Sequence, residues 1–196
     1  MDEAFGVKQD WSDFYGNQKE DCPINAPKPR GKEFIMRAFV DASFGDCKLT
    51  RKSRTGFIIY LNSAPIYYYS KKQGSCEIST FGSEFVAMKQ CCKYIKGLRY
   101  KLRMMGILIN NPAFVHGDNQ SVLWNTTVPE STLKRKSSSV AFHFVREGVS
   151  KDMWRTACIK TSLNVADIFT KVISSIKDRK RKIRMLLYDI YPESHK

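Results

Sequence analysis

The sequence lacks any apolar run that approaches the roughly 18 residues needed to span a bilayer. Its first residues, MDEAFGVKQD, are acidic, whereas a secretory signal would begin with basic residues and continue into an apolar stretch. We therefore expect a protein that stays inside the cell and has no membrane partner.

Cysteine and histidine patterns typical of zinc sites are also missing. The six cysteines form no CxxC pair, and the three histidines show no paired ligand spacing, so a zinc site is not expected. Inside the cell these thiols should be reduced. The adjacent Cys91 and Cys92 would point in different directions on a helix, so we interpret them as small hydrophobic residues and not as a redox pair.

Acidic residues are the scarcer charged class, with 19 Asp and Glu against 33 Lys and Arg, a net charge of +14. Residues 1–32 hold five basic and six acidic residues, so the whole positive excess lies in the remainder of the chain. Such an excess is typical of a surface that neutralises phosphates, and it also fits a merely soluble basic protein. Charge therefore indicates a class of partner but not a chemistry.

Sustained periodicity is absent from the first 32 residues, which end in CPINAPKPRGK, a stretch that disfavours regular structure. The chain as a whole contains 42% hydrophobic residues, enough for one domain with a sizeable core. We therefore expect a poorly ordered tether or linker over residues 1–32, one domain over residues 33–190 and a tail over residues 191–196.

Three strand-like runs rich in Ile, Val, Phe and Tyr follow: EFIMRAFVDASF, TGFIIYLN and APIYYYSKK. The short link LNSAP fits a hairpin, so we predict successive antiparallel strands. From about Ser79 to Met105 the apolar residues recur every three or four positions, which predicts a long helix. Downstream, AFVHGD and WRTACIK predict two more strands, with helices between them and a final helix from about Asn164. This order predicts a mixed α/β domain.

Four carboxylates stand at the ends of these predicted elements. They are Asp41 on the first strand, Glu84 near the start of the long helix, Asp118 at the end of the fourth strand, and Asp167 at the start of the last helix. Each alone has an ordinary explanation as a strand end, a helix cap or a first-turn acid. Together they predict a site on one face of the sheet, where they would repel one another unless cations bind between them.

Mg²⁺ is the natural cation for such oxygen ligands. Two Mg²⁺ ions about 4 Å apart can stabilise both the attacking water and the leaving oxygen of a phosphodiester. The four acids therefore lead to the hypothesis of metal-dependent phosphodiester hydrolysis with two Mg²⁺ ions, for which Mn²⁺ can substitute.

Six segments, in this order, resemble the ribonuclease H region of copia-type LTR retrotransposon (retrovirus-related) Pol polyproteins. They are AFVDASFGD, RKSRTGFIIYLNSAPIYYYSKKQ, STFGSEFVAMKQ, VHGDNQSV, HFVREGV and NVADIFTK. The resemblance covers roughly residues 31–172. It implies a ribonuclease H-like fold, with a mixed five-stranded sheet whose strands 1–3 are antiparallel and which is flanked by helices.

The resemblance also implies a chemistry. The catalytic and metal-binding acids of the family fall on Asp41, Glu84, Asp118 and Asp167. They imply endonucleolytic cleavage of the RNA strand of RNA–DNA hybrids during reverse transcription, leaving a 5′-phosphate and a 3′-hydroxyl. The implied partners are the hybrid and the reverse transcriptase domain of the same polyprotein. The implied location is a cytoplasmic virus-like particle or the nucleus.

Hybrid recognition would combine contacts to RNA 2′-hydroxyls with contacts to DNA phosphates. The expected nucleic-acid-binding residues lie beside the acids or in a basic loop: Ser43, Ser83, Asn119, Gln120, Lys134, Arg135 and Lys136. For the first four, capping of helices and strand ends is an equally good explanation. The cluster KDRKRKIR at 177–184 fits phosphate binding, a nuclear localisation signal or a solvated helix face.

Several positions depart from the family pattern. Gly82 replaces a frequent acid, Ser43 a frequent Asp, and Ser137 a frequent loop His. The segment KTSLNVAD also lacks the His that cellular ribonucleases H carry before the last acid. We expect His116 and His143 to be structural. An alternative function is that of a host-expressed retrotransposon remnant that binds nucleic acid or protein without cleaving.

Overall fold

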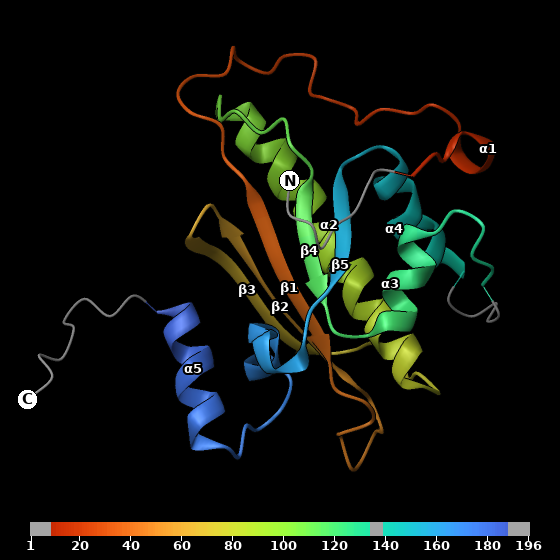
Figure 1. Cartoon of the computed structure of the whole chain (residues 1–196), viewed down its shortest axis with the longest axis vertical. Helices are drawn as coiled ribbons and strands as arrows, with labels where there is room; N and C mark the ends of the chain where they lie inside the picture. The colour runs from red at the N-terminus through yellow and green to blue at the C-terminus, as the bar shows by residue number, and fades with distance from the viewer. Residues whose placement is uncertain (1–8, 134–138, 188–196) are drawn as a thin grey trace, which may run out of the picture.

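The computed structural model describes residues 9–133 and 139–187, which form a five-stranded sheet flanked by helices (Figure 1). The strands are β1 (Met36–Ala42), β2 (Arg54–Leu61), β3 (Ala64–Lys72), β4 (Ala113–Gly117) and β5 (Trp154–Cys158). The helices are α1 (Ser12–Tyr15), α2 (Thr80–Met104), α3 (Gln120–Thr127), α4 (Ser139–Ser150) and α5 (Ile176–Leu186), with two 3₁₀ helices, η3 (Thr161–Leu163) and η4 (Val165–Phe169). Within the described ranges, no helix has the length and apolar character of a membrane span.

The strands lie in the order β3-β2-β1-β4-β5. β1, β2 and β3 pair antiparallel, whereas β4 is parallel to β1 and β5 is parallel to β4. The β2–β3 hairpin turns at Asn62, which has a φ of 55° and accepts a hydrogen bond from the Ile35 N–H through its side chain. The predicted mixed sheet with antiparallel strands 1–3 is therefore confirmed.

Two layers of unequal size cover the sheet. On one face, the buried side chains of β1, β2 and β4 pack against α2, α3 and α4 and form the main core. Cys91 and Cys92 of α2 are both fully buried there, in keeping with their interpretation as small hydrophobic residues. On the other face, a smaller core of Ile58, Tyr60 and Val165 lies under η4 and α5 (Figure 1). The C-terminal elements thus lie opposite the main helical layer.

The sequence predicts a final helix from about Asn164, with an interruption at Ser174 and Ser175 as an alternative. Between Asn164 and Ser175, a segment that the structure describes in full, there is no α-helix. The chain instead forms η3 and η4, and α5 begins only at Ile176. Asn164 accepts a hydrogen bond from the Ala166 N–H and donates one to the carbonyl of Val40 on β1, so it ties a short turn to the sheet. Ser175 then caps α5 by accepting a hydrogen bond from the Asp178 N–H. Local side-chain hydrogen bonds therefore replace one helix by two shorter elements.

The segment expected to be a tether contacts the rest of the molecule at several points, although most of its described residues are exposed. Trp11 is only 3% exposed, and its ring lies 4.9 Å from the guanidinium of Arg146 on α4. Glu20 forms ion pairs with Arg99 and Arg103 of α2 at 2.6 and 2.7 Å. The predicted domain boundary at residue 33 stays a prediction, but Trp11 packs on α4 and Glu20 pairs with α2.

Candidate active site

Three carboxylates meet at the C-terminal ends of β1 and β4. One oxygen from each of Asp41, Glu84 and Asp118 lies within 4.8 Å of the others, and among the described residues this cluster includes no histidine. Because β1 and β4 are parallel neighbours, their ends bring Asp41 and Asp118 to the same edge of the sheet. The N-terminus of α2, capped by the Ser79 hydroxyl, supplies Glu84 from its first turns.

The fourth acid, Asp167 of η4, is not part of this three-residue cluster and is linked to it through Lys171. η4 approaches β2 closely because Gly56, which pairs with Asp41 in the sheet, has no side chain to keep it away. Thr170 donates a hydrogen bond to a carboxylate oxygen of Asp41. The amino group of Lys171 lies 3.5 Å from Asp41 Oδ1 and 3.0 Å from Asp167 Oδ1. Asp41 and Asp167 therefore share the ammonium group of Lys171.

The sequence predicts that the four carboxylates converge on one face of the sheet. Three of them do meet within 4.8 Å, but Asp41 and Glu84 approach from opposite faces. Asp41 lies two residues after Phe39 and therefore on the same face of β1, where Phe39 packs in the smaller core under η4. Glu84 comes from α2, which covers the opposite face. The cluster lies at the strand ends, because only there do side chains from both layers reach each other.

Burial and mutual repulsion make the ionised forms of two of these acids unfavourable. Burial, only partly offset by the hydrogen bond from Thr170, raises the pKa of Asp41 to about 6. Burial, together with the charges of Asp41 and Asp118, raises the pKa of Glu84 to about 9. A divalent cation between the carboxylates would remove this penalty, and oxygen ligands of this kind suit Mg²⁺ or Mn²⁺. The residues present therefore fit a divalent metal ion.

Asp167 is held differently from the other three acids. Its Oδ2 pairs with the amino group of Lys182, a residue of α5 whose side chain is only 4% exposed. Lys182 also donates a hydrogen bond to the carbonyl of Thr161 at 3.2 Å. No signal in the sequence predicted this pair, because Lys182 lies within a run of basic residues that resembles a solvated helix face.

Three of the expected nucleic-acid-binding residues have local hydrogen-bond partners. Ser43 Oγ accepts a hydrogen bond from the Arg54 N–H, Ser83 Oγ donates to the Thr80 carbonyl, and Asn119 Oδ1 accepts from the Val122 N–H. These contacts are the capping roles weighed above. Gln120 is exposed at the start of α3, while Lys134, Arg135 and Lys136 lie outside the described residues. A role of all seven in binding nucleic acid stays a prediction.

The two described histidines both have aromatic contacts. His116 is 8% exposed and stacks on Phe39 with ring centroids 4.9 Å apart. His143 Nδ1 is 2.8 Å from the hydroxyl of Tyr15. These contacts agree with the structural roles expected for both.

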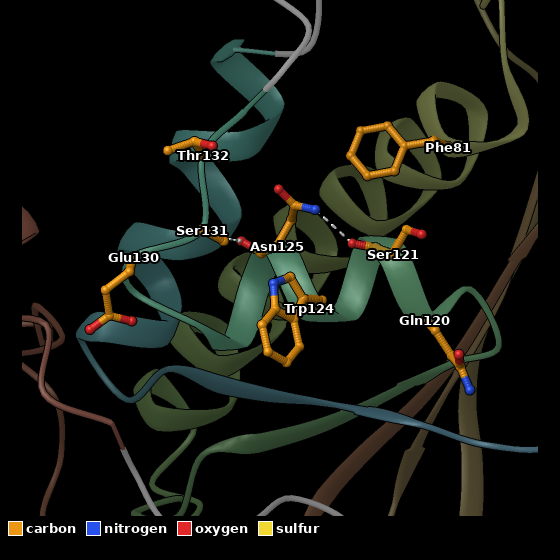
Figure 2. Close-up of a pocket in the computed structure, with 8 residues that line it drawn as sticks. All are labelled: Phe81, Gln120, Ser121, Trp124, Asn125, Glu130, Ser131 and Thr132. Atoms are coloured by element: carbon orange, nitrogen blue, oxygen red, sulfur yellow. Dashed lines mark hydrogen bonds between the residues drawn. The ribbon is translucent and has the colours of Figure 1, made fainter.

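A groove of about 760 Å³ lies beside the acid cluster, between the start of α2, the outer face of α3 and the segment that follows α3 (Figure 2). Trp124 of α3 is 64% exposed there. Two other residues of its lining are close in sequence to cluster acids: Gln120 follows Asp118 by two positions, and Phe81 precedes Glu84 by three. Arg146 holds the segment after α3 by donating hydrogen bonds to the carbonyls of Pro129 and Ser131. The sequence analysis did not predict this groove. A signal was present, because Trp124 is a large aromatic residue on the polar side of its helix.

Comparison with solved structures identifies the fold. The chain is similar to RNase H1 from the archaeon Halobacterium salinarum, with 13% identity, a TM-score of 0.53, and coverage of 69% of this chain and 94% of that one. It is also similar to the N-terminal RNase H domain of rv2228c from Mycobacterium tuberculosis, with 10% identity, a TM-score of 0.54, and coverage of 78% and 98%. A third match is LC11-RNase H1, solved in complex with an RNA/DNA hybrid, with 12% identity, a TM-score of 0.55, and coverage of 69% and 93%. The chain therefore has the ribonuclease H fold.

Sequence relatives give the second part of the identification. The chain is 26% identical over 145 residues to the retrovirus-related Pol polyprotein from transposon RE1 of Arabidopsis thaliana, covering 74% of this chain and 10% of that protein. It is 28% identical over 143 residues to the corresponding polyprotein from transposon TNT 1-94 of Nicotiana tabacum, covering 73% and 11%. No protein-family model matches the chain. Its homologues are thus retrovirus-related Pol polyproteins from transposons, of whose length it spans about a tenth. The assignment to the copia type stays a prediction.

Proposed function

We propose that this chain is a metal-dependent ribonuclease H that hydrolyses the RNA strand of RNA–DNA hybrids during retrotransposon reverse transcription. The observation that carries the proposal is the cluster of Asp41, Glu84 and Asp118, whose oxygens lie within 4.8 Å of one another at the ends of two parallel strands. Buried acids so close together are costly unless they bind cations.

In this proposal Asp41, Glu84 and Asp118 hold a divalent cation, and Asp167 contributes to a second. Two Mg²⁺ or Mn²⁺ ions, when bound, would supply activation of the attacking water and stabilisation of the leaving oxygen. Thr170 orients the Asp41 carboxylate through its hydrogen bond. Because the pKa of Glu84 is raised to about 9, this carboxyl releases a proton when it becomes a ligand near neutral pH.

The substrate assignment rests on charge and on the groove. The chain carries a net charge of +14, suited to a polyanion, and the groove with Trp124 offers an aromatic surface beside the acids. LC11-RNase H1, a structural neighbour, was solved with an RNA/DNA hybrid. The polyprotein relatives support a reverse transcriptase domain of the same polyprotein as partner.

The test is cleavage of a hybrid labelled on either strand, with Mg²⁺ or Mn²⁺. We expect cuts in the RNA strand only, leaving 5′-phosphate and 3′-hydroxyl ends. Asp118→Asn should abolish cleavage, because it keeps the shape of the side chain but removes the charge of a metal ligand. Asp178→Asn, which changes an acid on the surface of α5, is the matched control and should cleave normally. Cleavage by folded Asp118→Asn protein at the wild-type rate would remove this residue from the mechanism.

A second candidate function is a remnant that binds hybrids without cleaving them. The pairing of Asp167 with Lys182 favours it, because that carboxylate is neutralised by the protein itself. This candidate predicts salt-dependent hybrid binding by the wild-type protein and no cleavage of either strand with Mg²⁺ or Mn²⁺. The same assay therefore separates the two functions.

A further inference from the structure

α5 places a positive charge inside the acid site. Among the described residues of α5, Lys182 alone is buried, and its amino group meets two oxygen partners, Asp167 Oδ2 and the Thr161 carbonyl. A buried ammonium of this kind is stable only where its partner is a charged carboxylate. Lys182 therefore has an electrostatic role that its exposed neighbours lack.

The second lysine at the site is held less firmly. The Lys171 side chain is 45% exposed, and its amino group lies 3.0 Å from Asp167 Oδ1 and 3.5 Å from Asp41 Oδ1. An exposed lysine can rotate into water at little cost, so an arriving cation displaces it easily. The Lys182 side chain is only 4% exposed, on a helix that packs against η4, so rotation of its amino group into water is obstructed.

The balance between the four carboxylates and the two lysines limits how many divalent cations the site can hold. The four ionised carboxylates carry four negative charges; Lys182 offsets one of them, and Lys171 offsets a second for as long as it stays in place. The remainder matches one divalent cation, for which Asp41, Glu84 and Asp118 already provide oxygens within 4.8 Å of one another. A second divalent cation beside Asp167 would have to lie next to the buried ammonium of Lys182, which repels it.

We propose that Lys182 is an internal counter-ion that closes the Asp167 side of the site to a second divalent cation. The resting domain then binds one cation, and a second cation binds only when α5 withdraws Lys182. This inference rests on the proposed metal-dependent function and makes Lys182 a positioning residue that acts through Asp167.

The attachment of α5 is compatible with such a movement. Besides Lys182, the helix is held by hydrogen bonds from Tyr60 to the carbonyl of Met185 and from Arg181 to the carbonyl of Ser162. It lies apart from the main helical layer (Figure 1). Several of its basic residues are exposed: Lys177, Arg179, Lys180 and Arg184. A bound hybrid would attract them through its phosphates and so pull on the helix that carries Lys182.

The test counts bound Mn²⁺ by electron paramagnetic resonance in the absence of nucleic acid, so the readout is independent of catalysis. We expect one Mn²⁺ in the wild type and two in Lys182→Met, with affinity for the second ion raised about tenfold or more, equivalent to ~1.4 kcal/mol. Lys180→Met makes the same change at an exposed position of α5 and should bind one ion. The double variant Asp167→Asn/Lys182→Met should also bind one, because the second site has lost its ligand.

Lys182→Gln, which can still donate hydrogen bonds to Asp167 and Thr161, repeats the count if the methionine variant does not fold. Two ions in the wild type, or one ion in folded Lys182→Met and Lys182→Gln, would overturn the inference. If those counts are as expected but no hybrid is cleaved, the proposed function fails and the role of Lys182 stands. If hybrid is cleaved normally but the counts do not change with Lys182, this inference alone fails.

Discussion

Gly56 of β2 and Thr170, which follows η4, approach so closely that a Cβ atom on Gly56 would lie 2.6 Å from Thr170 Cγ2. The same Cβ would lie 2.8 Å from the Cβ of Phe169 and 3.2 Å from the carbonyl of Ala166. Since Gly56 pairs with Asp41 in the sheet, this contact sets how near the Asp167 segment comes to the other acids.

Gly56→Ala should therefore push η4 away from the sheet and weaken the hydrogen bond from Thr170 to Asp41. We expect a loss of about 1–3 kcal/mol in the free energy of unfolding, as for other overpacked sites, together with reduced hybrid cleavage. Urea unfolding and the cleavage assay measure the two effects. Gly74→Ala, whose added Cβ would meet no atom within 4 Å, is the control. Equal stability of the two variants would contradict this account of η4.

Glu84 should make the stability of the metal-free protein fall as pH rises. Burial first, and then the charges of Asp41 and Asp118, raise the pKa of Glu84 from 4.5 to about 9 in the folded state. Between these values the folded state binds the extra proton, so the stabilisation is complete below about pH 4.5 and is lost as pH rises through about 9. Urea unfolding in EDTA should show this decline, and Glu84→Gln should flatten it. A decline of equal slope in the variant would show that another group is responsible.

Glu20 should stabilise the domain from within the expected tether. Burial alone would raise the pKa of Glu20, but hydrogen bonds and charge from Arg99 and Arg103 lower it to about 2. This contribution is present above about pH 4.5 and is lost as pH falls toward 2. Glu20→Gln leaves the charge of buried Arg99 uncompensated, so we expect a loss of about 3 kcal/mol near neutral pH. Asp21→Asn, at an exposed neighbour, should change stability little, and a similarly small change in Glu20→Gln would contradict the prediction.

Trp124 should contribute to hybrid binding by stacking, because its ring is exposed in the groove beside the acids. Trp124→Ala should weaken binding of the hybrid to a catalytically inactive Asp118→Asn form by about 1–3 kcal/mol. Its free energy of unfolding should change little. Tyr100→Ala removes an exposed ring from α2 outside the groove and should bind like the parent protein. Equal affinities of both variants would exclude the groove from the binding surface.

The basic loop at Lys134, Arg135 and Lys136 should contact phosphates beside the cleavage point. Replacing all three by Ala should flatten the salt dependence of hybrid binding by roughly two units, since each neutralised phosphate contributes about 0.7 to 0.9. The comparison is a triple replacement of Arg179, Lys180 and Arg184 on α5. If the salt dependence of binding is unchanged in the variant of residues 134–136 but is flattened in the α5 variant, the phosphate contacts are made by α5 instead.

The sequence predicted the elements whose signals are local. Runs rich in Ile, Val, Phe and Tyr located the strands, the apolar stripe located α2, and the ends of β1 and β4 indicated where Asp41 and Asp118 would meet. It failed where distant contacts decide the outcome. Asn164 bonds to β1 and interrupts the expected final helix, and a lysine within an apparently solvated basic run turns inward to Asp167. Neither feature can be predicted from sequence periodicity, because each depends on a partner residue that the rest of the fold brings near.

Trp11 stacks on the guanidinium of Arg146, and Arg146 in turn donates hydrogen bonds to the carbonyls of Pro129 and Ser131 at the wall of the groove. A fragment that starts at residue 33 would keep all four acids but lose the indole that covers this arginine. Its substrate affinity would then reflect a differently shaped groove. The choice of first residue therefore decides whether a recombinant protein keeps the groove in the shape that Trp11 and Arg146 support.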